Sequence, residues 1–346
     1  MQAKVFDRDV LDSLVVRTFG GPPVSVEPMV GGASSRKYFR LVAPGGEKVV
    51  AMFVPDGLTP EEASKEQNTR WPFLEVHDLL VRARIDVPRI YADASQDGYL
   101  LLEDLGDRTL AQVLEREPAR KEELYRRSVA DLVAAQLHLA PLAAGTIVAS
   151  RRFDEELLRW EIEHFREWAL EARGITLPAD ARARFDRLAT ALAREVAAMP
   201  TAIVHRDYQS RNLMVREDGR IVWIDFQDAL IGPRVYDLVA LLNDSYQVFD
   251  PAFVGQRIVE AAEAQGLRPD VLAFEFHLVT VQRKLKDAGR FVFIDRVKGN
   301  PNFLTFVEPT LKKVRRSMAA VGAKHPVIEE LASILDPYLP ADDQES

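Results

Sequence analysis

The spacing of apolar residues changes near residue 106, and this change limits the possible folds more than any other feature of the sequence. Before it, short runs rich in β-branched and aromatic residues alternate with turns that contain Gly or Pro, which is typical of strands. Beyond it, Leu, Ala and aromatic residues recur at three- and four-residue spacing, which predicts amphipathic helices. The strand candidates are 24–30, 37–43, 48–54, 85–94 and 98–106, a helix is expected over 59–83, and the later helix candidates are 109–141, 153–173 and 179–199.

This change of pattern predicts two separately packed regions. The chain has 346 residues, the length of about two domains or of one bilobal unit. We therefore expect an α+β protein in which residues 1–105 form a small N-terminal lobe and residues 106–346 form a larger, mainly helical lobe. The tail 340–346 is expected to be frayed.

The composition excludes several classes of function. The sequence has no Cys, which removes disulfides, thiolate metal sites, thiol nucleophiles and iron–sulfur clusters. The formal net charge is -8, so neither a surface suited to a phosphate backbone nor a nucleic acid partner is expected. No apolar run is long enough to span a membrane, and the N-terminus does not have the pattern of a signal peptide. We therefore expect a cytoplasmic protein without a membrane partner.

One segment, residues 201–245, interrupts the helical half with strand-like runs on either side of a turn signal at 217–220. Asp207 follows the first apolar run, Asn212 opens the hairpin, and Asp225 ends its second strand. Two carboxylates and an amide offer oxygen ligands, which suit Mg²⁺ better than zinc. In phosphoryl transfer, one carboxylate orients the attacking hydroxyl while an Asn and a second Asp hold metal ions on the nucleotide. The order and spacing of these three residues agree with that chemistry.

The same segment resembles the aminoglycoside phosphotransferase family, whose fold is like that of protein kinases. HRDYQSRNLM (205–214) matches the catalytic loop of the family, and IDFQD (224–228) matches its metal-binding motif. The longer pattern through 245, with QRKLKDAGRF (282–291), is most similar to the bacterial anomeric kinases of N-acetylmuramate and N-acetylglucosamine. The resemblance covers about residues 20–320 and implies a bilobal kinase-like fold, with a small antiparallel sheet in the N-terminal lobe.

The resemblance also implies roles for individual residues. Asp207 would be the catalytic base, Asn212 and Asp225 the metal ligands, and Asp237 an acid that braces the site. ATP and Mg²⁺ are the implied cofactors. Single Asp and Asn residues more often serve as caps and turns, but the joint, ordered match favours a site. His205 is interpreted as a packing residue.

The N-terminal half would hold the nucleotide. The segment 31–41 would cover the phosphates and the segment 101–108 would be the hinge next to the adenine. The residues expected to bind the nucleotide are Gly32, Ser34, Ser35, Arg36, Glu103 and Leu105. One departure from kinase-like folds is Met52, which stands where the third strand usually carries a Lys. Arg36 and Lys37 are the expected cationic substitutes.

The sequence leaves the acceptor site less defined. The candidates for contact with the substrate are Asp207, Arg211, Asp228, Arg234 and Trp168. Arg234 is equally compatible with a role as a helix cap. Asp228 is equally compatible with a turn or with a role in the second shell of ligands around the metal. Trp160, His164 and Trp168 form a stripe at four-residue spacing that could stack on a sugar, although such stripes more often belong to a core.

These observations predict an ATP-dependent kinase that phosphorylates the anomeric hydroxyl of N-acetylmuramate, N-acetylglucosamine or both, in peptidoglycan recycling. One alternative is a kinase of another hydroxyl compound, such as an aminoglycoside or an amino alcohol. A second alternative, motivated by Met52, is a nucleotide-binding pseudokinase that serves as a scaffold.

Overall fold

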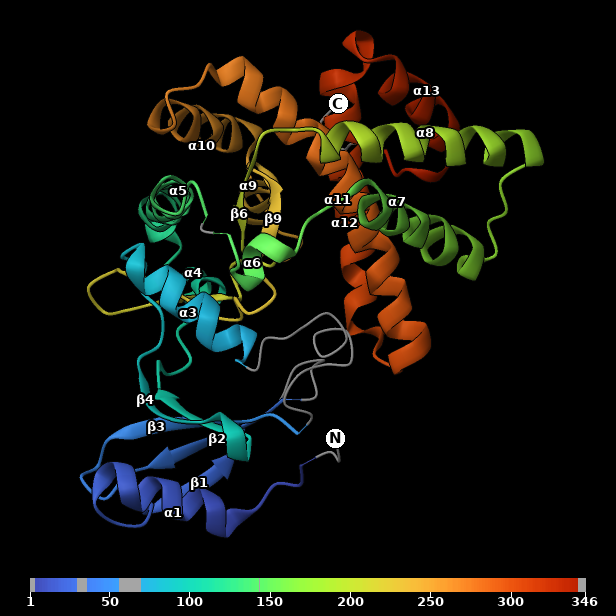
Figure 1. Cartoon of the computed structure of the whole chain (residues 1–346). Coiled ribbons are helices and arrows are strands. Elements are labelled where there is room, and N and C mark those ends of the chain that lie inside the picture. Colours follow the sequence, from blue (N-terminus) through green and yellow to red (C-terminus); the bar gives the residue numbers. More distant parts are fainter. Residues whose placement is uncertain (1–3, 30–35, 56–69, 143, 342–346) are drawn as a thin grey trace. The chain divides into compact units, whose positions relative to one another are not determined.

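The computed structural model describes residues 4–29, 36–55, 70–142 and 144–341 (Figure 1). The chain divides into two compact units, and each of them is built from two stretches of sequence. Unit 1 comprises Met1–Arg108 and Met214–Gln227, and unit 2 comprises Thr109–Leu213 and Asp228–Ser346. The assignment of a nucleotide lobe to residues 1–105 and a catalytic lobe to the remainder stays a prediction.

Unit 1 is built on a five-stranded sheet in the order β1-β2-β3-β5-β4, in which every neighbouring pair is antiparallel. The strands are β1 (Ser25–Pro28), β2 (Lys37–Val42), β3 (Lys48–Phe53), β4 (Ile90–Ala94) and β5 (Tyr99–Glu103). They lie within the five predicted runs. Met52 pairs with Tyr38 of β2 and with Leu100 of β5, and its side chain is buried. It is therefore part of the core of the sheet, as an apolar side chain on a central strand should be.

A helix that the sequence analysis does not assign covers this sheet. Helix α1 (Arg8–Phe19) begins at Asp7, whose carboxylate accepts hydrogen bonds from the next backbone N–H groups, and ends at Gly20 in the left-handed conformation (φ 83°). Its buried residues Leu11, Leu14 and Val15 pack with β-strand residues in one hydrophobic cluster. The cap residues are the sequence signal that would have identified it.

The described part of unit 1 also contains a helix and a hairpin. Helix α3 (Pro72–Arg82) starts at Pro72, within the predicted segment 59–83, and residues 59–69 of that segment lie outside the described residues. Strands β7 (Leu213–Val215) and β8 (Ile221–Trp223) pair around a turn in which Gly219 has φ 83°. Backbone hydrogen bonds from Val215 to Arg108 (2.8 Å) and from Trp223 to Asp86 (2.9 Å) join the hairpin to the first stretch of the chain. The predicted hairpin is therefore confirmed.

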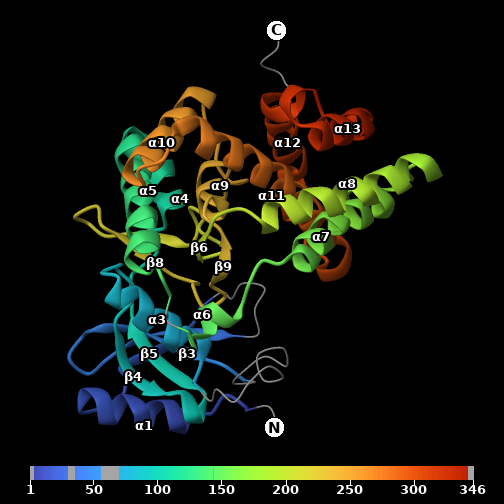
Figure 2. The same cartoon turned by 45° about the horizontal axis from the view of Figure 1, so that its top comes forward.

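Unit 2 is mainly helical and is organised around α11 (Pro269–Lys298), which contacts α7, α10 and α12 (Figures 1 and 2). The other helices are α4 (Leu110–Arg116), α5 (Lys121–His138), α6 (Ile147–Ser150), α7 (Glu155–His164), α8 (Ala179–Ala197), α9 (Tyr236–Leu242), α10 (Pro251–Ala264), α12 (Val307–Val321) and α13 (Pro326–Leu335). A π-helical turn, Phe165–Leu170, continues α7. The predicted helical character of this half is confirmed.

A small sheet completes unit 2. Strand β6 (Thr201–Val204), which contains the start of the first apolar run in 201–245, pairs antiparallel with β9 (Leu230–Pro233), which the sequence pattern does not predict. The Gly and Pro in Leu230–Pro233 are typical of a turn, which explains why sequence patterns miss this strand. Of the predicted frayed tail, residues 342–346 lie outside the described residues. In the described part of the chain, no helix is long and apolar enough to cross a membrane.

Candidate active site

The loop that follows β6 is held in place by a buried carboxylate. Asp237, at the start of α9, is completely buried and accepts hydrogen bonds from the backbone N–H groups of His205 (2.5 Å) and Arg206 (3.0 Å). Burial raises the pKa of Asp237 to about 6, although the nearby positive charges and these two hydrogen bonds act in the opposite direction. The contacts let Arg206 keep a positive φ of 79°, which is uncommon for a residue with a side chain. Asp237 thus braces the loop.

Four further hydrogen bonds, from three residues, fix the remainder of this loop. Both the backbone N–H and the hydroxyl of Ser210 donate to Oδ2 of the fully buried Asp244, at 2.9 and 2.5 Å. The Tyr208 hydroxyl donates to a main-chain oxygen of α5 (2.8 Å), and the side-chain amide of Asn212 donates to the main-chain oxygen of Asp207 (2.9 Å). Because these hydrogen bonds satisfy polar groups of the loop and of the segments packed against it, they favour a single conformation of the loop.

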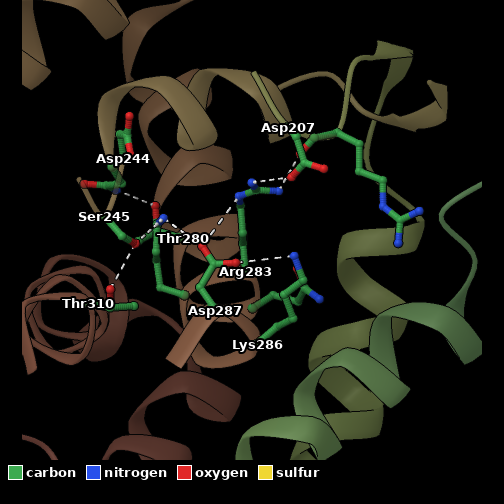
Figure 3. Close-up of polar contacts among 12 residues, drawn as sticks. Asp207, Asp244, Ser245, Thr280, Arg283, Lys286, Asp287 and Thr310 are labelled. Atoms are coloured by element: carbon green, nitrogen blue, oxygen red, sulfur yellow. Dashed lines mark hydrogen bonds and ion pairs between the residues drawn. The ribbon is translucent and has the colours of Figure 1, made fainter. Parts of the chain in front are cut away.

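Asp207 is the side chain that this loop presents. It is about half exposed (47%), and Nη2 of the buried Arg283 lies 3.7 Å from its Oδ1 (Figure 3). Burial alone would raise the pKa of Asp207, but the positive charges of Lys286, Arg283 and Arg206 hold it below the ordinary value. Asp207 is therefore an ionised, partly exposed carboxylate at neutral pH.

Sequence reasoning assigned no role to the cluster of charges on α11 that supports Asp207. Nη1 of Arg283 donates to the main-chain oxygen of Arg206 (2.9 Å), which ties the helix to the loop. Asp287 accepts from Lys284 (2.8 Å) and Lys286 (3.3 Å), and these cations keep its pKa low although burial would raise it (Figure 3). The i, i+3, i+4 spacing within QRKLKDAGRF was the available signal, since such residues share a helix face.

In unit 1, Asp225 follows β8 and is exposed. It has a positive φ of 62°, and Oδ1 of its carboxylate accepts a hydrogen bond from the side chain of Gln227 (2.9 Å). A residue with a side chain adopts this backbone conformation only when its surroundings impose it, and such residues cluster at functional sites. The second carboxylate oxygen suits a hard cation. Asn212 has committed its amide nitrogen to the loop, so its amide oxygen is the atom that it can offer to a cation.

The donor chemistry of Asn212 and Asp225 therefore fits Mg²⁺, which takes oxygen ligands. Among the residues that the structure describes, no group of three or more His, Cys, Asp or Glu side chains could hold a metal ion. When Mg²⁺ binds with a nucleotide, it usually takes only one or two carboxylate ligands from the protein and completes its coordination with water and phosphate oxygens.

The hinge segment lines a cavity of about 480 Å³ in unit 1. Its lining residues are Asp104, Leu105, Arg108, Met214, Val215, Arg216, Glu217 and Asp218. Glu103, the preceding residue, uses its carboxylate in a two-point ion pair with Arg216 (2.7 and 3.0 Å), and its backbone N–H donates to Arg89. Leu105 therefore borders the cavity directly, whereas Glu103 supports its wall.

The remaining nucleotide candidates are only partly covered by the structure. Arg36 directly precedes β2, and the predicted residues Gly32, Ser34 and Ser35 lie outside the described residues. Lys37 begins β2 and is exposed. Their proposed contacts with phosphate remain predictions.

A comparison with known families decides the class of the protein. The family model described as "Phosphotransferase enzyme family" matches residues 25–271. This chain belongs to that family. The resemblance derived from the catalytic-loop and metal-binding motifs is thereby confirmed.

Relatives of this phosphotransferase extend over most of its length. It is 34% identical over 323 residues to the N-acetylmuramate/N-acetylglucosamine kinase of Pseudomonas aeruginosa, covering 91% of this chain and 88% of that protein. The identity to the same-named kinase of Pseudomonas putida is 34% over 292 residues, covering 82% and 80% of the two chains. Amicoumacin kinase hAmiN, solved with AMP-PNP, Ca²⁺ and Ami, has a TM-score of 0.60 at 13% identity, covering 98% of this chain and 97% of that one. The likeness establishes the bilobal kinase-like α+β fold.

The candidate acceptor residues of the phosphotransferase have different surroundings. Arg211 is exposed and its guanidinium lies 3.6 Å from the centre of the Tyr246 ring. Arg234 forms a two-point ion pair with the buried Glu275 (2.8 and 2.6 Å), an arrangement that braces the start of α9. Asp228 is partly buried and contributes to the electrostatic surroundings of Arg206. Of these three, Arg211 is the one whose cationic group is exposed.

The aromatic stripe contains both buried and exposed members. Trp160 is largely exposed, His164 is buried, and Trp168 is intermediate and packs edge-on against Phe293 (4.9 Å between ring centres). Burial lowers the pKa of His164 to about 4, with Arg290 and then Lys286 adding to the effect. The stripe is thus neither wholly core nor wholly surface, and its buried imidazole is neutral at physiological pH.

Proposed function

We propose that this phosphotransferase is an ATP- and Mg²⁺-dependent kinase that phosphorylates the anomeric hydroxyl of an amino sugar, N-acetylmuramate or N-acetylglucosamine or both. The names of relatives that match over four fifths or more of the chain support the sugar class. Because those sugars are released from the cell wall, we further propose that the reaction serves peptidoglycan recycling in the cytoplasm. The proposed cofactor is consistent with a structural neighbour that was solved with the ATP analogue AMP-PNP.

The observation that carries the proposal is the state of Asp207. Its carboxylate is ionised, half exposed and held by a loop whose backbone is fixed at Asp237 and Asp244. Such a group can accept a hydrogen bond from the anomeric hydroxyl, orient the oxygen towards the γ-phosphate and take the proton as the bond to phosphorus forms. A base with a low pKa is adequate here, since the transition state is loose and catalysis depends mainly on positioning and electrostatic stabilisation.

Mg²⁺ would neutralise charge on the nucleotide phosphates when it is bound. The protein's part is to offer the amide oxygen of Asn212 and the carboxylate of Asp225 as ligands. Leu105 and the hinge cavity would receive the adenine of the nucleotide. Arg36 and Lys37 would supply the positive charge that Met52 cannot. Glu103 would act indirectly, by holding Arg216 at the cavity wall.

The proposal is tested by phosphorus NMR of the purified protein with ATP, Mg²⁺ and each sugar. A new anomeric sugar-phosphate signal is expected from the wild type. Asp207→Asn should lower kcat by about 10²–10⁴-fold, the range for loss of a positioned base, while binding of ATP is retained. Asp270→Asn, which changes an exposed carboxylate in the first turn of α11, is the matched control and should keep its turnover.

Two results would overturn the proposal. One is an Asp207→Asn protein that keeps most of its turnover. The other is a folded wild type that binds ATP and transfers phosphate to neither sugar. In the second case, a panel of aminoglycosides and amino alcohols would separate a kinase with another acceptor from a pseudokinase.

A further inference from the structure

One face of α11 carries a row of three cationic side chains followed by an aromatic ring. The row begins beside Asp207 and continues along the helix. Arg283, Lys286, Arg290 and Phe293 follow one another at spacings of three, four and three residues, which places them on the same side of a helix. Arg283 and Lys286 belong to the cluster beside Asp207 (Figure 3). Lys286, Arg283 and Arg206 all act on the ionisation of Asp207, and Arg290 interacts electrostatically with Asp207 and Arg206.

The charges in this row are not all paired. Arg283 lies beside Asp207, and Lys286 shares Asp287 with Lys284. Arg290, by contrast, is half buried and forms no ion pair or hydrogen bond with any residue that the structure describes. Its guanidinium lies 4.8 Å from the centre of the Phe293 ring. Burial lowers the pKa of Arg290, yet a guanidinium remains charged at any physiological pH.

Two further acids near this row do not pair with Arg290 in the described part of the chain. Glu161 is fully buried and accepts a hydrogen bond from Gln282 (2.9 Å), and Asp228 lies near Arg206. Neither forms an ion pair with Arg290 among the described residues. A cation that is half removed from water without a counter-charge is unfavourable, so such a group is best explained by an anionic ligand.

Aromatic rings border the guanidinium of Arg290. The π-helical turn Phe165–Leu170 carries Trp168, which meets Phe293 at right angles, and π-turns are frequent at functional sites. His164 is 5% exposed, and its Nε2 has no hydrogen-bond partner among the described residues. Arg290 and Lys286 influence its ionisation. At Gly289 an added Cβ would lie 2.5 Å from the main-chain oxygen of His164, so α11 and this turn are in close contact.

We propose that this part of unit 2 binds a carboxylate on the acceptor, and that Arg290 makes the enzyme prefer an acidic amino sugar over a neutral one. The inference rests on the proposed function and specifies its substrate class. N-acetylmuramate carries a carboxylate on its lactyl ether, and N-acetylglucosamine has none. The guanidinium of Arg290 matches a carboxylate at two points, and the rings of Trp168 and Phe293 provide an apolar surface for the sugar.

The test compares two ligands of nearly the same shape, N-acetylmuramate and its carboxamide, with N-acetylglucosamine as a third. The ratio of kcat/KM for the acid to that for the amide is measured in the wild type, Arg290→Gln and Arg290→Lys. Arg296→Gln is the matched control, because Arg296 is exposed on the same helix next to Asp295. A charge-assisted pair predicts that Arg290→Gln lowers this ratio by about 10–100-fold, chiefly through KM for the acid.

Arg290→Lys should keep part of the preference, and Arg296→Gln all of it. An equal loss with acid and amide would show a structural role and would overturn the inference. So would a rise in KM for ATP at an unchanged acid-to-amide ratio, because the cations would then serve the nucleotide phosphates.

Calorimetric titration with the acid and the amide separates this inference from the proposed function, since it requires no turnover. Tighter binding of the acid, lost in Arg290→Gln, would support the inference even if another reaction were catalysed. Equal affinity of the wild type for acid and amide would overturn it, even if both sugars were phosphorylated.

Discussion

The hinge of unit 1 and the loop after β6 in unit 2 both rely on carboxylates, but in different surroundings. The side chains of Glu103 and Arg216 at the hinge are 22% and 29% exposed and bind each other. Asp237 is 0% exposed and binds two backbone N–H groups. Water can replace a lost partner at the hinge but not at the buried loop. The same chemical group should therefore contribute little to stability in one place and much in the other.

The strongest test of this difference is Asp237→Ala. The change leaves the N–H groups of His205 and Arg206 buried without an acceptor and removes support for the positive φ of Arg206. We expect a loss of about 2–4 kcal/mol in the free energy of unfolding, since each unsatisfied buried group costs roughly 1–3 kcal/mol. Urea titration of the full chain measures it. A loss below about 1 kcal/mol, as for an exposed acid, would show that the loop does not depend on this carboxylate.

The pH dependence of stability gives a smaller and more specific effect. The pKa of Asp237 is raised by burial from an ordinary 3.8 to about 6, so the folded state binds the proton more tightly than the unfolded state. The stability from this group is fully present below its unfolded pKa and is lost as the pH rises through the folded pKa. Between about pH 7 and about pH 5, the wild type should therefore gain about 1 kcal/mol relative to Asp237→Asn, which cannot titrate.

The two proteins are compared by urea titration at several pH values. Subtracting the variant removes the contribution of Asp207, whose lowered pKa gives the opposite dependence. A difference that stays flat over this range would mean that Asp237 remains ionised, held by its two hydrogen bonds.

The smallest effect is expected at the hinge. Glu103→Gln removes the carboxylate charge that pairs with Arg216. In the wild type, burial would raise the pKa of Glu103, but the hydrogen bonds from Arg216 hold it low. Because both side chains are partly solvated, the free energy of unfolding should fall by less than about 1 kcal/mol. High salt should reduce the difference further. A loss as large as that of Asp237→Ala would remove the distinction between the two regions.

The sequence predicted the strands of the sheet and the hairpin because local signals define them. Turn residues and short apolar runs set the limits of β2, β3 and β5, and the turn before Ile221 identifies the hairpin. Helix α1 and strand β9 were missed for local reasons as well. The first was obscured by charges among its apolar residues, and the second by its Gly and Pro.

The residues that support Asp207 could not be predicted from the sequence, for a different reason. Arg283, Lys284 and Asp287 have the appearance of a solvated helix face, and only the tertiary structure shows that they are buried among each other. The motif residues Asp207 and Asn212 were found because their order along the chain is itself informative. Their partners come from distant segments, and pairing at such separation leaves no local pattern.

The discontinuous composition of unit 1 has a consequence for synthesis on the ribosome. Strand β8 and residues up to Gln227 complete a unit whose other part ends at Arg108. More than a hundred residues of unit 2 are translated between these two stretches. The backbone oxygens of Asp86 and Arg108 must therefore wait for their donors, the N–H groups of Trp223 and Val215. Domains usually fold in turn as they emerge, from the N-terminus onward. In this chain a ribosome that stops before residue 214 releases a protein in which neither unit is complete.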